Sequence, residues 1–149
     1  MDHAAVLEPN ARELLGSQRL AVLATEADGV PYASLIAFAA SPDFGYLVFA
    51  TPRLTRKFSN LCRNPHVALL VDNRSNREED FATAAAVTVV GTAREAEGER
   101  REGCLALLLG KHPYLAAFAR SPGCAIFRVD AESCHVVNRF QSVTDLQVR

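Results

Sequence analysis

The chain has 149 residues, a length that fits one compact domain and suffices to bury a hydrophobic core. Sixteen lysine and arginine residues nearly balance seventeen aspartate and glutamate residues, so the sequence lacks the overall positive charge typical of proteins that bind nucleic acid or anionic membranes. There is no tryptophan and aromatic residues make up 7% of the chain, which disfavours a base-stacking surface. We therefore expect neither nucleic acid nor a membrane as a partner.

The chain contains four cysteines, at Cys62, Cys104, Cys124 and Cys134. No two of them have the short spacing of a zinc knuckle or of a Cys-x-x-Cys redox motif, and Cys134 and His135 point to opposite faces of any strand that contains both. We therefore expect no bound metal. The N-terminal residues lack the basic and then apolar segment of a signal peptide, and no apolar stretch is long enough to span a bilayer. These features predict a cytoplasmic protein with reduced thiols.

The first third of the chain predicts a short helix followed by a three-stranded meander. Glu8–Gln18 has a proline in its first turn and an apolar side, as expected of a helix. Leu20–Thr25 and Tyr32–Ala40 have the composition of strands, and Asp28-Gly29 between them is a hairpin signal. A further turn leads to a third strand, Tyr46–Ala50.

The middle of the chain predicts one helix and two strands. In Leu54–Asn64 the apolar residues recur with the spacing of an amphipathic helix, and the proline that follows ends it. Val67–Asp72 is a further strand. Asn73–Asp80 is polar and predicts a loop, either a mobile lid over a bound ligand or a plain surface loop. Ala85–Arg94 is a longer strand in which Gly91 indicates a bulge or the close approach of another backbone.

The last third predicts two helical pieces and two strands. Glu97–Leu109 is a helix with Gly110 as its C-cap, and Pro113 begins a second piece that ends near residue 119. Ala125–Val129 and Cys134–Asn138 complete the set of strands. Six to seven mostly antiparallel strands with short flanking helices predict a mainly β (α+β) barrel. No segment resembles a linker, so we expect a single domain over residues 1–149.

A basic cluster stands at the start of the predicted helix over Leu54–Asn64. Arg53, Arg56 and Lys57 lie within five residues, with Thr55 among them and no acidic residue. A helix N-terminus carries partial positive charge, so cations are mildly unfavourable there. A bound anion would remove this penalty by accepting bonds from backbone N–H groups, from the Thr55 hydroxyl and from the two cations that follow it. The pattern indicates an anion site, with a solvated basic helix end as the alternative.

Five segments stand in the order and spacing of one known family. They are Val30-Pro31-Tyr32, Val48-Phe49-Ala50-Thr51, Thr55-Arg56-Lys57, Asn64-Pro65-His66-Val67-Ala68-Leu69-Leu70 and Val87-Thr88-Val89-Val90-Gly91-Thr92-Ala93. The chain from about residue 20 to residue 93 resembles the pyridoxamine 5′-phosphate oxidase-like family of FMN-binding split barrels. Further on, Lys111-His112-Pro113 and Val137-Asn138-Arg139-Phe140 look more like the branch that includes haem-utilisation proteins. The resemblance implies a six- to seven-stranded antiparallel split β-barrel.

The resemblance also implies a cofactor site and a partner. In this family FMN lies in a cleft between two subunits, which implies a homodimer whose second chain closes the site. The FMN phosphate would be held by Thr55, Arg56 and Lys57. The ring and the ribityl chain would contact Ala50 and Thr51 at one strand end and Ser34, Leu35, Ile36 and Ala37 along the neighbouring strand.

Three positions depart from the true pyridoxamine phosphate oxidases. Where those enzymes have arginine, lysine and glutamine, this chain has Ser34, Ala39 and Ala86. The C-terminal segment with arginine, histidine and tryptophan that completes their vitamin site has no counterpart in residues 145–149. Because the groups that hold vitamin B6 are missing, we do not expect that activity.

The sequence therefore predicts an FMN-dependent oxidoreductase that acts on an unidentified small molecule, with the chemistry carried by the cofactor and no assigned catalytic side chain. Two alternatives stay open. One is a split barrel that uses deazaflavin F420, whose phosphate would occupy a similar basic site. The other is a non-catalytic module that holds flavin or haem, for which His66, His112 and His135 are candidate haem ligands.

Overall fold

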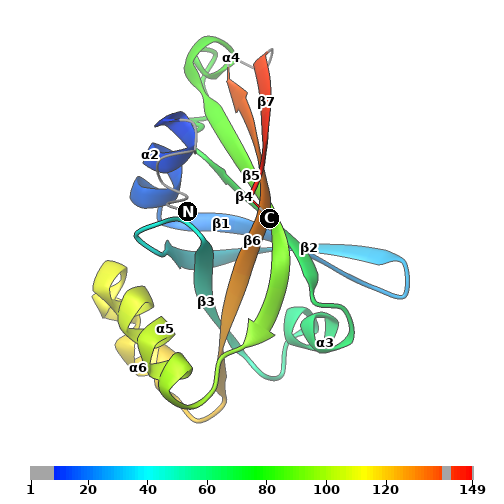
Figure 1. The fold of residues 1–149 in the computed structure, drawn as a ribbon, viewed down its shortest axis with the longest axis vertical. Helices are drawn as coiled ribbons and strands as arrows, with labels where there is room; N and C mark the ends of the chain where they lie inside the picture. The colour runs from blue at the N-terminus through cyan, green and yellow to red at the C-terminus, as the bar shows by residue number, and fades with distance from the viewer. Residues whose placement is uncertain (1–8, 139–141, 149) are drawn as a thin grey trace.

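The computed structural model describes residues 9–138 and 142–148 as an antiparallel barrel with helices outside it (Figure 1). In these ranges the strands are β1 (Leu20–Ala27), β2 (Val30–Ala40), β3 (Tyr46–Pro52), β4 (His66–Asp72), β5 (Ala85–Glu95), β6 (Cys124–Asn138) and β7 (Ser142–Gln147). The helices are α2 (Pro9–Ser17), α3 (Arg56–Arg63), α4 (Asp80–Thr83), α5 (Gly98–Lys111), the short 3-10 helix η1 (Pro113–Leu115) and α6 (Ala116–Ala119).

The barrel is closed by a single long strand. The strands pair in the order β3-β2-β1-β4-β5-β6-β7, and a further pairing of β3 with β6 closes the first six into a ring. Each of these pairings is antiparallel. The first half of β6 pairs with β3 and its second half with β7, while β5 runs along most of its length. The predicted six- to seven-stranded antiparallel barrel is thereby confirmed.

The continuous strand β6 corrects the prediction of two separate strands, Ala125–Val129 and Cys134–Asn138. The polar residues between them suggest a turn, but they have partners along the barrel wall. Asp130 pairs with Arg128 at 2.9 Å, and Glu132 accepts a hydrogen bond from a threonine on β5 at 2.9 Å. Strand β7 is absent from the sequence prediction, because its largely polar residues show no strand pattern apart from their pairing with β6.

Alternate residues of each strand fill the barrel interior. On β1, Leu23 and Thr25 point inward and are buried, as the two-residue period of a strand requires. Next to α3 the interior is aromatic: Phe49 and Phe127 stack with their centroids 5.5 Å apart, and Phe58 of α3 meets Phe127 edge-on at 5.9 Å. These contacts attach α3 to the barrel and fix where that helix begins.

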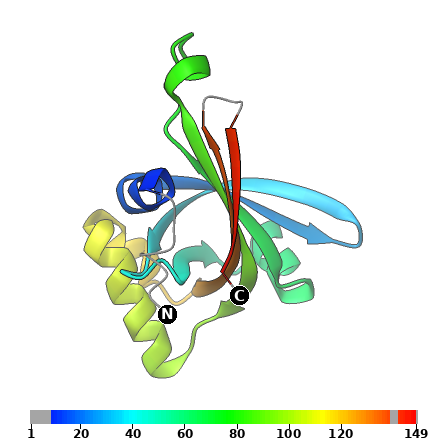
Figure 2. The ribbon, with the colours of Figure 1, turned by 45° about the horizontal axis from the view of Figure 1, so that its top comes forward.

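A second hydrophobic layer joins the helical hairpin, defined as α5, η1 and α6, to the outside of the barrel. Cys104, Leu105 and Leu108 of α5 pack against Ala39 of β2 and Val48 of β3. Both ribbon views place α5 and α6 on one side of the barrel and α3 on another (Figures 1 and 2). Within the described ranges, no helix has the length and apolar character needed to cross a membrane.

Helix α5 continues past Gly110, which the sequence predicts as its C-cap. Left-handed glycines in the described chain are Gly29 and Gly98, so Gly110 keeps the helical conformation. The C-cap is His112, whose N–H donates to the Leu108 carbonyl oxygen at 2.9 Å. The proline that follows disfavours helical geometry at His112, and this restriction ends the helix without a glycine.

Gly91 marks the closest approach between β5 and β6. The register of the two strands shifts between Val90 and Gly91, which confirms the bulge predicted from sequence. A Cβ atom on Gly91 would lie 2.2 Å from the backbone oxygen of Asp130. Glycine is therefore required here by the neighbouring backbone.

We expect Gly91→Ala to lower the free energy of unfolding by at least about 2 kcal/mol, because the methyl group must displace the backbone of β6. Gly103→Ala is the matched control: Gly103 lies exposed inside α5, and a Cβ there meets nothing within 4 Å. Alanine at that position should stabilise the helix by up to about 1 kcal/mol. Urea denaturation measures both effects, and a Gly91→Ala protein as stable as the wild type would contradict the bulge geometry.

Candidate functional site

A cleft of about 230 Å³ lies between the start of α3, the outside of β2 and β3, and the helical hairpin. The strand side of the cleft consists of Leu35, Ile36, Ala37, Ala50 and Pro52, and the hairpin side of Leu108, Leu115 and Phe118. Helix α3 contributes Lys57, the one ionisable side chain among these nine residues. The fold thus gathers residues predicted to bind the cofactor from three separate segments around one hollow.

Thr55 orders the first turn of α3. Its backbone is extended, with φ −119° and ψ 158°, and its Oγ1 accepts the N–H of Phe58 at 3.2 Å, as in a helix N-cap. The same hydroxyl donates to the carbonyl oxygen of Pro52 at 3.0 Å and lies 3.1 Å from Oγ1 of the buried Thr51. The N–H groups of the next two residues have no acceptor within the helix, so they are available to a ligand at this end.

Lys57 is partly buried at the edge of the cleft. Burial lowers the pKa of its ammonium group below the ordinary value of 10.5, because the charged form loses hydration. Lys57 takes part in none of the ion pairs formed among the described residues. A partly desolvated cation at the positive end of a helix carries an electrostatic cost that a bound anion would relieve.

The other two cations of the predicted cluster lie in different surroundings. The guanidinium carbon of Arg56 is 5.5 Å from the ring centroid of Tyr32, and Arg56 lines a separate hollow of about 360 Å³. Arg53 makes two hydrogen bonds to the carboxylate of Glu95, at 3.0 and 2.7 Å. The charge of Arg53 is therefore balanced by a neighbour, and Lys57 is the cation of this cluster that borders the cleft.

Three predicted site residues, Ser34, Ile36 and Thr51, turn their side chains into the barrel, and Ile36 packs in its core with 5% exposure. Leu35 lines the cleft, so the alternation along β2 puts the side chain of Ser34 on the inner face. The Ser34 Oγ atom is buried and has no hydrogen-bond partner among the described residues. Thr51 is completely buried, with its hydroxyl 3.2 Å from the Pro52 carbonyl oxygen. A ligand in the cleft would therefore meet these three residues through their backbone.

The helical hairpin is anchored to the barrel at the end of α5. The Lys111 ammonium group donates to the backbone oxygen of Gln18 and lies 4.0 Å from the ring centroid of Phe38. His112 is completely buried, with Nε2 2.8 Å from the Phe38 carbonyl oxygen and Nδ1 3.0 Å from the Tyr114 hydroxyl. Both anchors reach Phe38 on β2, the strand that forms one side of the cleft.

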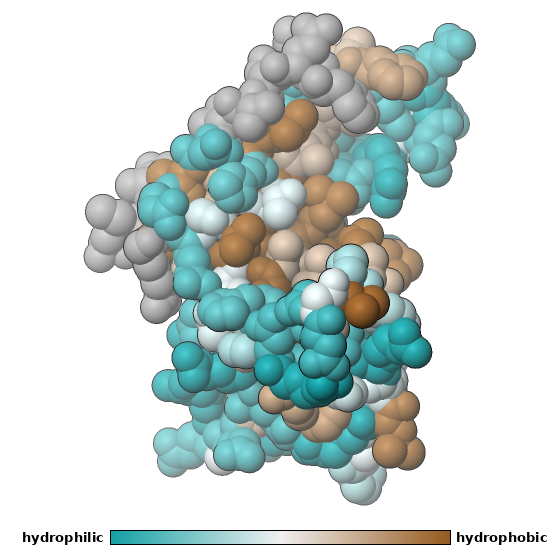
Figure 3. All heavy atoms as spheres, turned by 90° about the vertical axis from the view of Figure 1, so that its right-hand side faces the viewer, coloured by the Kyte–Doolittle hydropathy of each residue, from teal (hydrophilic) through white to brown (hydrophobic). Residues whose placement is uncertain are grey.

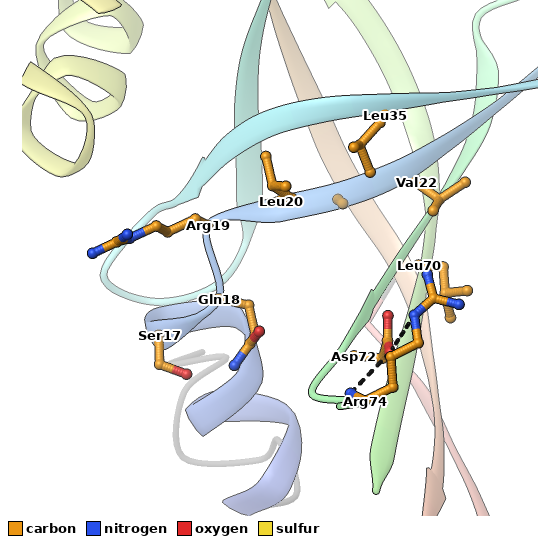
Figure 4. Close-up of a pocket in the computed structure, with 10 residues that line it drawn as sticks. Ser17, Gln18, Arg19, Leu20, Val22, Leu35, Leu70, Asp72 and Arg74 are labelled. Carbon is orange, nitrogen blue, oxygen red and sulfur yellow. Dashed lines mark hydrogen bonds and ion pairs between the residues drawn. The ribbon is translucent and has the colours of Figure 1, made fainter. Parts of the chain in front are cut away.

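A larger hollow of about 610 Å³ lies outside β1 and β2, between α2 and the end of β4 (Figure 4). Leu20, Val22 and Leu35 line it from the strands, and at its edge Arg74 pairs with Asp72 at 3.1 Å. Leu35 therefore borders both this hollow and the cleft.

A third group of polar side chains joins β6 to β7. His135 Nδ1 is 2.6 Å from Asp145 Oδ1 across the strand pair, and its Nε2 is 3.1 Å from Ser133 Oγ. The contacts run from serine to histidine to aspartate, as in a hydrolase triad. However, Asp145 is exposed, and other residues line the three hollows described above. We interpret these contacts as structural, because they hold β7 against β6.

The strand order and the closure by β6 define a split barrel with a cleft at the start of α3. The sequence profile of the family described as pyridoxamine 5′-phosphate oxidase matches residues 7–138, and the chain belongs to this family. No curated protein matches the chain.

Three solved structures illustrate the range of similar proteins. A haem-binding protein from Mycobacterium smegmatis has a TM-score of 0.83 and 19% identity, over 95% of this chain and 60% of that one. A FAD-binding protein from Mesorhizobium loti has a TM-score of 0.66 and 22% identity, over 87% and 94%. A putative pyridoxamine 5′-phosphate oxidase from Listeria innocua has a TM-score of 0.66 and 18% identity, over 87% and 96%. The chain spans about three fifths of the mycobacterial protein's length, and these likenesses show a shared fold.

The Lys111 anchor predicts a pH dependence of stability. Burial lowers the pKa of this ammonium group from 10.5 to about 8, so between these values the unfolded chain binds more protons than the folded chain. The contribution of Lys111 to the free energy of unfolding should therefore rise with pH in this window, by less than about 1 kcal/mol because the group is partly exposed. The buried Cys134, whose pKa burial raises to about 11, acts in the opposite direction, so the measured quantity is the difference between the wild type and Lys111→Met. Urea denaturation of both proteins across this pH range gives that difference, and a difference that does not change with pH would exclude a contribution from Lys111.

Proposed function

We propose that the cleft binds FMN and that the chain is an FMN-dependent oxidoreductase acting on a small molecule. The observation that carries this proposal is Lys57, a partly buried cation with a lowered pKa that borders an otherwise apolar cleft at a helix N-terminus. A phosphate joined to an apolar planar group matches both ends of such a site.

The arrangement assigns each end of the ligand to different residues. The phosphate accepts bonds from the first N–H groups of α3 and from Lys57, and Thr55 keeps that turn in place. Arg56, in the same helical turn, adds a second positive charge. For this contact its side chain moves away from Tyr32 and toward the phosphate. The ring lies along Leu35, Ile36, Ala37 and Ala50 on one side and along Leu115 and Phe118 on the other.

A bound flavin supplies the hydride chemistry, and the residues of the chain bind it, orient it and exclude water. The cleft lining has no acid or base besides Lys57. Ala39, which replaces the lysine of the true pyridoxamine phosphate oxidases, is 2% exposed and packed beneath α5. The strand therefore presents no second cation, and we infer a substrate without a phosphate group.

Identifying the bound cofactor distinguishes the FMN enzyme from the F420 and haem alternatives. F420 also carries a phosphate, and mass spectrometry of the extracted cofactor distinguishes it from FMN. A haem would need a free ligand, but both ring nitrogens of His112 and of His135 are within hydrogen-bond distance of other groups. His66 lies exposed at the start of β4, outside the lining of the cleft. A protein that holds FMN but is reduced by neither NADH nor NADPH, with every small molecule tried, would be a carrier or sensor.

Removing the phosphate-binding cations should weaken the binding of FMN but not the binding of riboflavin, which lacks the phosphate. We expect Arg56→Ala with Lys57→Ala to weaken FMN binding about 100-fold, because two charge-assisted contacts are lost, and to leave riboflavin affinity unchanged. Arg53→Gln is the matched control, since it removes a cation that is already paired with Glu95. Fluorescence titration measures both affinities. Full FMN affinity in the double variant would refute the phosphate assignment.

We further propose that the chain forms a homodimer in which the second copy completes the cleft. The cleft of about 230 Å³ is smaller than the roughly 300 Å³ at which ligand pockets for molecules of this size begin. Leu20 and Leu35 are 51% and 62% exposed beside the larger hollow, which Leu35 borders together with the cleft. The space-filling view shows apolar side chains gathered across the middle of one face, above a largely polar lower part (Figure 3). An apolar surface of this kind favours a protein partner.

Leu35→Asp should convert the dimer to a monomer, because a carboxylate cannot be buried unpaired at a subunit contact. Flavin affinity should fall in the same variant, since Leu35 also lines the cleft. Ala106→Asp places the same side chain on the exposed side of α5 and should leave the mass unchanged. Size-exclusion chromatography with light scattering measures the mass, and a monomeric wild type would overturn the dimer.

A further inference from the structure

The apolar wall of the cleft is carried by a short segment that follows a buried histidine. Leu115 ends η1 and Phe118 lies in α6, and both face the cleft from the hairpin side. Neither η1 nor α6 is longer than four residues, so their own backbone bonds give them little rigidity. Their position against β2 depends on Ala119 of α6, which is buried in the second hydrophobic layer, and on what fixes the chain just before them.

His112 supplies that fixed point. It is completely buried, and its Nε2 lies 2.8 Å from the carbonyl oxygen of Phe38, one residue beyond Ala37 of the cleft. A carbonyl oxygen only accepts, so Nε2 carries a hydrogen and donates to it. The Tyr114 hydroxyl lies 3.0 Å from Nδ1, within hydrogen-bond distance, and the two rings meet edge-on with their centroids 5.8 Å apart.

These two hydrogen bonds tie both sides of the cleft to one side chain. Nε2 holds the backbone of β2, and Nδ1 holds Tyr114, the residue directly before Leu115. The backbone carbonyl of His112 also accepts the N–H of Leu115 at 3.0 Å. His112 thus joins the strand side of the cleft to the hairpin side, in addition to the packing of α5 and α6 on the barrel.

We propose that His112 is a positioning residue for the cofactor: it holds Leu115 and Phe118 at the separation from β2 that clamps the flavin ring. The proposal rests on the flavin function proposed above. His112 itself does not line the cleft, so it acts through the wall and not by touching the ligand. Its loss lowers the fraction of molecules whose wall is in the binding position, and the apparent affinity falls by that fraction.

The test compares FMN and riboflavin on the full chain. We expect His112→Ala to weaken both flavins by the same factor, about tenfold, because the wall contacts the ring that the two ligands share. His112→Gln keeps a donor for the Phe38 carbonyl and should lose less affinity. Tyr114→Phe removes the hydroxyl of a residue that is 69% exposed, so it should fold normally and weaken both flavins about threefold.

Two readouts separate positioning from a loss of stability. Val136→Ala shortens a side chain in the barrel core and lowers the unfolding temperature, but it should leave both flavin affinities unchanged. The visible absorption band of the bound flavin should lose its vibronic structure in the His112 variants, because the ring is no longer clamped, and should keep it in Val136→Ala.

Different results of these experiments would contradict different claims, either the positioning role of His112 or the proposed flavin function. Wild-type affinities in Tyr114→Phe and in a folded His112 variant would overturn the positioning role while the flavin function stands. Weaker FMN binding with unchanged riboflavin binding would also overturn it, since that result places the effect at the phosphate. If His112→Ala does not fold, Tyr114→Phe and His112→Gln decide the question. A wild type that binds no flavin would overturn the proposed function and this inference together.

Discussion

The pairing of β6 with both β3 and β5 is the constraint on which the rest of the structure depends. It closes the barrel, and closure is compatible with the chain because Gly91 lets the backbone of β5 pass the Asp130 carbonyl at a distance no side chain would allow. Closure also fixes Pro52 against Cys124 at the end of β3. The turn that begins there delivers Thr55 and the start of α3 to the edge of the cleft.

Local patterns in the sequence predicted most of the barrel and the helix that carries the cations. The spacing within Leu54–Asn64 and the glycine at position 91 are signals that a few neighbouring residues contain. The continuity of β6 and the existence of β7 could not be predicted this way, because both depend on partners far along the chain. The sequence predicts the end of α5 too early, because Gly110 is typical of a C-cap, whereas the restriction that Pro113 imposes on His112 ends the helix.

The same limit explains which parts of the candidate site could be predicted. The sequence predicted a basic helix start beside a strand end, and the family resemblance indicated the strands of the cleft. It could not show that Arg53 pairs with Glu95 or that Arg56 lies over Tyr32, since both contacts join distant segments. The role proposed for His112 could not be predicted either: a histidine before a proline indicates a helix end, and the Phe38 carbonyl that it contacts lies 74 residues away in sequence.

The two ends of the cleft use different physical effects, and together they give the site its directionality. At the helix end, a cation that burial has partly stripped of water is destabilised in the free protein, so an anion there gains both the charge contact and the relief of that cost. At the hairpin end, the chain offers apolar surface from a segment that follows the buried His112, which donates a hydrogen bond to the backbone of β2. A phosphate placed at the hairpin end would leave its charge unpaired. A ring placed at the helix end would leave apolar surface in water. One ligand orientation is therefore favoured over its reverse before any substrate arrives, which is what a cofactor with a single reactive ring requires.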